Sequence, residues 1–369
     1  MGYKKYLVFL AGFCSFLVIS GSIQAQSYKF DSEWPKLPLP NKWWMQGVTG
    51  LYVDHEDNIW VLNRPSNLNN TENYAQLDPP VAECCVAPPA VIVFDMEGNV
   101  VRSWDTQEGH GMMVDREGYV WIGSDTVRKF TSDGELVGTI ERIPEAEPPD
   151  GKYPPDTEMI VDQIEEVRAD EVLRELYTID NYLNGRVMVY DMDTLEFKRG
   201  WGAYGKSLSE IGGVSTDGGG VEFYTSESPE RDIETPSQDF VGHVTLGLSN
   251  DGWVYVADRR GNRIQVFTRQ GEFQKEFFLA TWTRQRGSAG GVAFSHDAEQ
   301  RFLIIPDIQN NTIWILNRED GTVVSRVGSA GDNGGQFHGL HMLAVDSSGN
   351  LYTGEVQQGE RVQRFSLNN

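Results

Sequence analysis

The sequence is poor in cysteine, in histidine and in basic residues. It has three cysteines and six histidines among 369 residues, and 31 Lys and Arg against 54 Asp and Glu give a formal net charge of −23. So few cysteines exclude a small disulfide-stabilised scaffold, and a hydrophobic core must therefore hold a chain of this length. The excess of negative charge repels phosphate backbones and argues against a nucleic-acid partner.

Long apolar runs are also lacking, except near the N-terminus. Met1–Ala25 reads MGYKKYLVFLAGFCSFLVISGSIQA, with two lysines, an apolar stretch over Tyr6–Ile19 and small residues before its end. This is the three-part layout of a secretory signal peptide, and the apolar stretch is short for a spanning helix, which needs about 20 apolar residues. We therefore expect cleavage after Ala25, a secreted or periplasmic protein without stable membrane insertion, and a single domain over residues 26–369. Loss of the two lysines would take the net charge from −23 to −25.

Without this leader only two cysteines remain, Cys84 and Cys85, which are adjacent in AECCVAPPA. In an oxidising compartment they form either a strained vicinal disulfide or a pair of free thiols. A soft metal-ligand pair and a redox latch are further alternatives. The sequence does not decide among them.

What the sequence has in abundance is a recurring pattern of short strands. Apolar and polar residues alternate in segments rich in β-branched and aromatic residues, and the turns between them contain Gly, Asn and Asp. Helical periodicity is lacking, which excludes an α-solenoid, and a β-sandwich would not explain a repeat. The copies cover Gly50–Arg64, Gly111–Val137, Glu166–Trp201, Leu246–Phe277, Gly291–Val327 and Leu343–Phe365.

Six copies at intervals of roughly 45 to 80 residues predict an all-β fold, a six-bladed β-propeller with a four-stranded sheet in each blade. The last copy ends after three strands, so we expect the N-terminal segment YKFDSEW to supply the fourth strand and close the ring. Three insertions interrupt the pattern, at Pro65–Pro89, Pro144–Asp156 and Gly202–Asp239. Long loops of this kind are either functional or disordered.

The repeat sorts the histidines into two groups. His55 and His296 fall in turns between a first and a second strand, where we expect no chemical role. The other four precede or begin a first strand, which is innermost in a propeller: His110, His243, His338 and His341. Three imidazoles that converge from different blades and leave one position open are typical of a catalytic zinc site. Ordinary histidines on the rim of the channel are the alternative.

The segments GHGMMVDREGYVWIG, HVTLGLSNDGWVYVADRRGNRIQVF and HMLAVDSSGNLYTGEV resemble the NHL-type propeller of the peptidyl-α-hydroxyglycine α-amidating lyases and their bacterial relatives. The resemblance covers nearly the whole chain after the leader. It implies that His110, His243 and His341 bind zinc. His341 matches better than His338, because its distance along the chain to Tyr352 resembles the distance in the family.

The same resemblance implies roles for other polar residues. Arg64 matches an arginine that binds the substrate carboxylate, Tyr182 matches the catalytic base, and Arg259 matches a second active-site arginine. Animal members have Asp directly after the third histidine, where it contributes to a structural calcium site. Here that position holds Met342, which puts the calcium ion in question. The additional histidine, His338, is expected to bind substrate or to support the metal ligands from outside.

The chemistry follows from these groups. An α-hydroxyglycyl amide breaks to an amide and glyoxylate when its hydroxyl loses a proton and the C–N bond cleaves. Zinc lowers the pKa of a bound hydroxyl, Tyr182 would take the proton, and the planar guanidinium of Arg64 suits a carboxylate. We therefore predict a secreted, monomeric zinc-dependent carbon–nitrogen lyase acting on a small-molecule or peptide-derived substrate.

Two alternative functions remain from the sequence. One is a propeller hydrolase or lyase acting on another small ester, lactone or carbinol. The other is a non-catalytic NHL propeller that binds protein or glycan through its acidic face.

Overall fold

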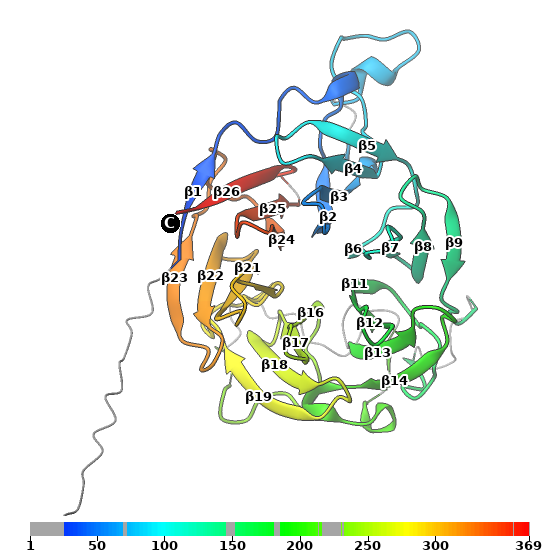
Figure 1. Ribbon diagram of the computed structural model, residues 1–369, viewed down its shortest axis with the longest axis vertical. Coiled ribbons are helices and arrows are strands. Elements are labelled where there is room, and N and C mark those ends of the chain that lie inside the picture. The colour runs from blue at the N-terminus through cyan, green and yellow to red at the C-terminus, as the bar shows by residue number, and fades with distance from the viewer. Residues whose placement is uncertain are drawn as a thin grey trace, which may run out of the picture.

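Each repeat folds into a four-stranded antiparallel sheet, and six such sheets stand around a common axis (Figure 1). The structure, a computed structural model, describes residues 26–68, 72–144, 152–180, 185–212, 214–215, 230, 232–356 and 358–368. The predicted signal peptide, residues 1–25, lies outside the described residues. Within the described ranges no helix is long and apolar enough to cross a membrane. The predicted six-bladed β-propeller is confirmed.

The N-terminal half of the chain forms blades 1 to 3. Blade 1 consists of β2 (Gly47–Val53), β3 (Ile59–Arg64), β4 (Val91–Phe94) and β5 (Val100–Trp104). Blade 2 consists of β6 (Met112–Val114), β7 (Val120–Gly123), β8 (Val127–Phe130) and β9 (Leu136–Thr139). Blade 3 consists of β11 (Ile164–Asp170), β12 (Glu175–Asp180), β13 (Arg186–Asp191) and β14 (Phe197–Trp201). In each blade the first strand lies nearest the axis (Figure 1).

The C-terminal half forms blades 4 to 6. Blade 4 consists of β16 (Val244–Leu248), β17 (Trp253–Asp258), β18 (Arg263–Thr268) and β19 (Phe273–Phe278). Blade 5 consists of β20 (Ala293–Phe294), β21 (Phe302–Asp307), β22 (Thr312–Asn317) and β23 (Val323–Val327). Blade 6 consists of β24 (Leu340–Val345), β25 (Leu351–Glu355), β26 (Val362–Asn368) and β1 (Ser27–Asp31).

The ring closes as the sequence predicts. Strand β1 pairs antiparallel with β26, with Ser27 opposite Asn368 and Asp31 opposite Arg364. The N-terminal strand thus completes the last blade and covers its outer edge, which leaves the ring without an open seam.

Two of the insertions contact each other. Strand β10 (Lys152–Tyr153) lies in the second insertion and pairs with β15 (Val214–Ser215) in the third. In the first insertion Cys84 and Cys85 form a vicinal disulfide. Short 3₁₀ helices also lie in the loops: η1 (Pro40–Lys42), η2 (Pro65–Asn67), η3 (Tyr74–Gln76), η4 (Ala203–Gly205) and η5 (Leu208–Glu210).

An aspartate fixes the turn after the first strand of several blades. In blade 1, Asp54 Oδ1 accepts the backbone N–H groups of Glu56 and Asn58, at 2.9 Å each, and Oδ2 accepts the indole N–H of Trp60 at 2.7 Å. Similar turns recur at Asp115 in blade 2 and Asp346 in blade 6. The carboxylate satisfies backbone donors that the tight turn leaves without strand partners.

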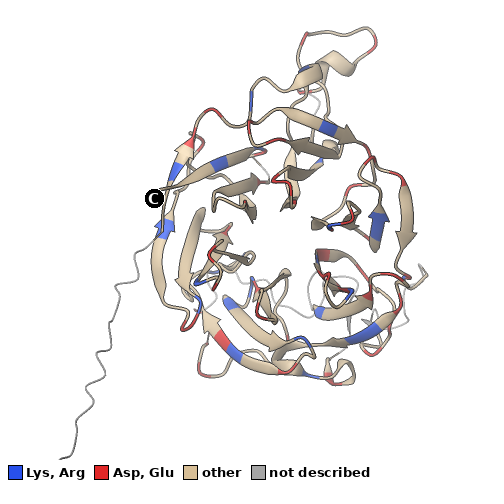
Figure 2. Cartoon of the chain, in the orientation of Figure 1, with Lys and Arg blue, Asp and Glu red and all other residues tan. Residues whose placement is uncertain are grey.

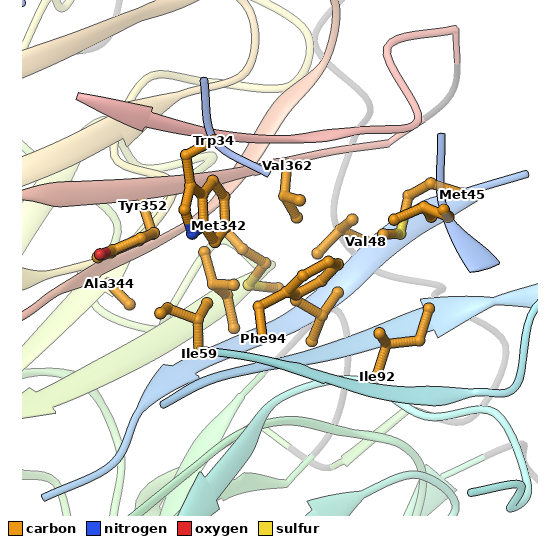
Figure 3. Close-up of a cluster of buried hydrophobic side chains, with 13 residues drawn as sticks. Trp34, Met45, Val48, Ile59, Ile92, Phe94, Met342, Ala344, Tyr352 and Val362 are labelled. Atoms are coloured by element: carbon orange, nitrogen blue, oxygen red, sulfur yellow. The ribbon is translucent and has the colours of Figure 1, made fainter. Parts of the chain in front are cut away.

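Six apolar clusters hold the blades together, one between each pair of neighbours. The cluster between blades 6 and 1 includes Trp34, Phe94, Met342 and Tyr352 (Figure 3). Alternate residues of each strand point into these clusters, which is the pattern that predicted the strands. Met342 is therefore an apolar packing residue at the ring closure.

Charged residues are spread around the whole ring (Figure 2). Acidic and basic residues lie together in many of the loops and strand ends, although the chain carries 54 Asp and Glu against 31 Lys and Arg. Many basic side chains are paired, as Arg174 is with Glu117 and Asp193. This is the distribution of a solvated surface with scattered ion pairs.

Candidate functional site

The first strands of blades 3 and 6 begin with a β-bulge. In β24 the register passes from Leu340 directly to Met342, so that His341 is the extra residue, and in β11 Glu165 is the extra residue in the same way. A bulge changes the direction of a side chain at the end of a strand. The two bulges accommodate His341 and Glu165 as extra residues, outside the regular alternation of apolar and polar side chains.

The other two histidines of the predicted site lie just ahead of first strands. His110 lies two residues before β6, and its backbone N–H donates to the carbonyl of Gly123 at 2.8 Å. His243 directly precedes β16 and has a left-handed backbone, with φ of 52°. A non-glycine residue in this region is strained and is frequent at functional sites.

His110 and His341 are in contact. Their Nε2 atoms lie 3.3 Å apart, and the two rings meet edge to face at an angle of 84°. The Nδ1 atom of His110 lies 2.7 Å from the carbonyl oxygen of Glu165, and that of His341 lies 3.1 Å from the carbonyl oxygen of Val48. A carbonyl oxygen only accepts hydrogen bonds, so each Nδ1 atom carries the proton.

His243 is oriented by a carboxylate. Its Nδ1 atom lies 2.9 Å from Glu165 Oε1, and the residue is 9% exposed. Neutral imidazole has a single N–H, so a hydrogen bond that uses Nδ1–H leaves Nε2 without a proton. All three rings therefore have an unprotonated Nε2 atom.

The surroundings keep these rings neutral. Burial lowers the pKa of His110 to about 4, and the positive charge of Arg64 acts in the same direction. Burial also lowers the pKa values of His341 and His243 well below the usual range of histidine. The positive charge of Arg259 lowers both pKa values further. Neutral imidazole is the form that ligates metal ions.

The donor set fits a metal ion such as zinc at His110 and His341. Two unprotonated nitrogens at 3.3 Å repel each other unless a cation or a proton lies between them, and the low pKa values disfavour the proton. Two ligands at 2.0–2.1 Å from a tetrahedral zinc are separated by roughly 3.3 Å. Within the described part of the chain, no group of three or more His, Cys, Asp and Glu side chains is already arranged to hold a metal. The pair thus has the spacing, while a third ligand is not in place.

Both predicted arginines lie near the histidines. Arg64 ends β3, is half-buried, and its charge acts on the pKa of His110 and His341. Its guanidinium has no hydrogen bond or ion pair among the residues that the structure describes. Arg259 is 6% exposed, and its Nε donates to the carbonyl of Arg286 at 3.0 Å.

The structure does not join His338 to this cluster, and it does not describe Tyr182. Tyr182 lies outside the described residues, so its predicted role stays a prediction. His338 lies in the loop before β24, with 44% of its side chain exposed, and its Nδ1 atom is 2.8 Å from Asp332 Oδ1. The additional histidine therefore points toward a surface carboxylate in this conformation.

Glu165 is the residue that the sequence reasoning missed. It is 1% exposed and touches two of the three histidines. Burial raises the pKa of its carboxyl group to about 7, against the opposing effect of nearby positive charge. A signal was present, because Glu165 stands five residues before the turn aspartate Asp170, as His341 stands five before Asp346.

A separate cavity of about 460 Å³ lies at the carboxyl ends of the inner strands. Tyr52, Arg168, Leu248, Phe294 and Ala344 contribute to it, from five different blades. The histidines lie at the amino ends of the inner strands, so this cavity and the histidine cluster are at opposite ends of the channel.

The fold and this cluster define a class of protein: a six-bladed β-propeller with neutral imidazoles converging at one end of its inner strands. The chain matches no protein-family model. It is 22% identical over 348 residues to peptidyl-glycine alpha-amidating monooxygenase B of Xenopus laevis, covering 91% of this chain and 35% of that protein. It is 20% identical over 356 residues to monooxygenase A of the same species, covering 91% and 33%.

The chain thus spans about a third of the length of the curated relatives it matches, and the similarity to these amidating enzymes is distant. Among solved structures, a structural genomics protein of unknown function from Bacteroides thetaiotaomicron superposes with a TM-score of 0.53 at 16% identity. That alignment covers 88% of this chain and 70% of the other. This likeness supports the fold.

Proposed function

We propose that this propeller is a secreted zinc-dependent lyase that cleaves the C–N bond of an α-hydroxyglycine-type substrate. The observation that carries the proposal is the spacing of 3.3 Å between the unprotonated Nε2 atoms of His110 and His341, whose Nδ1–H groups donate to backbone carbonyls. The distant similarity to the amidating enzymes of Xenopus laevis points to the same chemistry.

His110 and His341 would hold the metal, with His243 as the third ligand. The Nδ1 atom of His243 contacts Glu165, and the charge of His243 acts on the pKa of His110, which places the two histidines near each other. Zinc in such a site lowers the pKa of a bound hydroxyl and leaves one position open for substrate. Met342 packs in an apolar cluster and offers no oxygen ligand, so we assign no calcium ion to it.

Arg64 would bind the substrate carboxylate. It is half-buried beside the histidines, and its guanidinium has no partner among the described residues. The planar fork of five N–H donors matches a carboxylate in a two-point contact. Arg259, which is buried near His243, adds positive charge on the same side of the substrate.

The remaining chemistry consists of two proton transfers and the cleavage of the C–N bond. The substrate hydroxyl gives its proton to a base, the carbon–oxygen double bond of glyoxylate forms, the C–N bond breaks, and the base returns the proton to the amide nitrogen. We assign the first of these transfers to Tyr182 as general base. His338 would contact the outer part of the substrate, since its exposed ring lies three residues from His341.

We also propose a location, an oligomeric state and a class of partner for the protein. The leader over residues 1–25 would direct the protein to the periplasm or the exterior. There it would act as a monomer on a small-molecule or peptide-derived substrate, without nucleic acid and without stable membrane insertion.

The direct test is release of glyoxylate from α-hydroxyhippurate by the purified protein supplied with zinc. We expect stoichiometric benzamide and glyoxylate, and loss of both products in the His110→Ala variant. No product from a protein that retains zinc would assign the site to another ester, lactone or carbinol. If the protein forms no product and binds no metal, the non-catalytic propeller is the better assignment.

A further inference from the structure

Glu165 occupies the position in blade 3 that histidines occupy in blades 2 and 6. Each of these residues stands five positions before the aspartate that caps the next turn: His110 before Asp115, Glu165 before Asp170, and His341 before Asp346. In β11 and β24 the residue is also the extra residue of a bulge. The repeat therefore aims a carboxylate from blade 3 at the same region as the imidazoles.

One residue orients two of the histidines. The carbonyl oxygen of Glu165 accepts from His110 Nδ1 at 2.7 Å, and its carboxylate oxygen Oε1 accepts from His243 Nδ1 at 2.9 Å. Blade 3 lies between the blades that carry these histidines, so Glu165 links ligands from both of its neighbours. Both hydrogen bonds leave Nε2 as the nitrogen without a proton.

The carboxylate of Glu165 is more than a packing group. It is 1% exposed, and its second oxygen, Oε2, is buried without a hydrogen-bond partner. A buried carboxylate without full hydrogen bonding destabilises a fold, and such groups persist at functional sites. The adjacent Glu166 is also buried, but Arg168 Nη1 lies 2.7 Å from its Oε1.

We propose that Glu165 is a positioning residue of the metal site, fixing the tautomer and direction of His110 and His243 and placing a negative charge beside the bound cation. This inference rests on the proposed function. A carboxylate or carbonyl behind a ligating histidine orients the ring and raises its basicity, and loss of such a partner weakens metal binding about 10–100-fold. The backbone carbonyl of Glu165 accepts from His110 and its side chain accepts from His243. A substitution of Glu165 therefore removes only the hydrogen bond to His243.

The test compares Glu165→Ala and Glu165→Gln with wild-type protein, and uses Glu166→Gln as the matched control. The first measurement is the dissociation constant for Co²⁺ from its visible absorption, with thermal melting to confirm folding. We expect the dissociation constant for Co²⁺ to rise about 10–100-fold in Glu165→Ala, to rise less in Glu165→Gln, and to stay unchanged in Glu166→Gln.

The second measurement is independent of metal. Long-range ¹H–¹⁵N spectra of the metal-free protein report which ring nitrogen carries the proton. We expect the Glu165→Ala substitution to release His243 from its Nδ1–H tautomer while His110, bound to the backbone, keeps its own. An unchanged His243 signal would contradict the proposed contact.

The outcomes separate this inference from the function on which it rests. Wild-type protein that binds no Co²⁺ or Zn²⁺ would overturn the proposed function. Wild-type protein that binds metal while Glu165→Ala binds within twofold of the same constant would overturn only the role of Glu165. If Glu165→Ala does not fold, Glu165→Gln provides the test. A dissociation constant for Co²⁺ within twofold of the wild-type value would then overturn the role of Glu165.

Discussion

His110 and His341 lie 231 positions apart in the chain, and their Nε2 atoms are 3.3 Å apart in the structure. The backbone carbonyl oxygens of Glu165 and Val48 accept hydrogen bonds from Nδ1 of His110 and His341, so the protons lie on Nδ1 and not on Nε2. The closed ring places blade 2 and blade 6 on either side of blade 1, and the first strands of both blades contact β2. The contact is therefore a consequence of the propeller topology.

Substitution of Arg64 should impair binding of substrates that carry a carboxylate. Arg64→Ala removes a charge-assisted contact worth about 1.5–3 kcal/mol, so we expect kcat/KM for α-hydroxyhippurate to fall roughly 10–100-fold, mainly through KM. Arg64→Lys should recover part of the loss, since lysine keeps the charge without the planar fork. The measurement is steady-state kinetics of glyoxylate release. An equal loss with a substrate whose carboxylate is blocked as an amide would rule out this role.

The buried ion pair of blade 3 should contribute strongly to stability. Arg186 and Asp180 are both fully buried, with Nη2 and Oδ2 2.6 Å apart, and Arg186 also donates to carbonyls of Pro155, Thr157 and Met159. Arg186→Met leaves an unpaired buried carboxylate and should lower the free energy of unfolding by about 3–5 kcal/mol.

The control for this prediction is Arg102→Met, because Arg102 pairs with an exposed aspartate, Asp133. We expect a loss below about 1 kcal/mol there. Urea denaturation followed by tryptophan fluorescence measures both variants. Equal losses in the two variants would show that the burial of the Arg186 pair does not determine its contribution.

Acid should remove the stabilisation that Glu175 provides. The hydrogen bond from Arg199 holds the pKa of this carboxyl group at about 2, against 4.5 in the absence of partners. A depressed carboxyl pKa stabilises the fold above pH 4.5, and this stability is lost as the pH falls from 4.5 toward 2. Solvent screening reduces the contribution of this partly solvated ion pair, which we expect to be on the order of 1 kcal/mol.

Thermal melting between pH 6 and pH 2 tests this prediction. Glu175→Gln should be less stable than wild type at pH 6, and the difference should shrink as the pH approaches 2 because the wild-type carboxylate becomes protonated. A constant difference over the whole range would contradict the assignment to Glu175.

Much of the fold could be predicted because it is encoded locally. Alternation with a period of two predicts the strands, and the Asp-centred turns place their ends, so the six blades are visible in the sequence. The closure of blade 6 by β1 is confirmed, since a copy with three strands lacks an edge partner. Glu165 stands five residues before a turn aspartate, as His110 and His341 do, so the sequence held a signal for it as well.

Other features could not be predicted because they depend on contacts between distant loops. The pairing of β10 with β15 joins two insertions whose sequences show no strand pattern. The orientation of His338 toward Asp332 is set by the fold of a single loop. Glu165 could not be predicted from the histidine pattern, because it shares the position of His110 and His341 relative to the turn but is a different residue type.

The most direct test of the account is the metal content of purified protein. Elemental analysis should find a single zinc ion per chain in wild-type protein and in His55→Ala, whose histidine lies in an exposed turn. His110→Ala and His341→Ala should each lose the metal while remaining folded. Wild-type protein without a stoichiometric divalent metal, or full zinc content in a His110→Ala/His341→Ala double variant, would contradict the central claim.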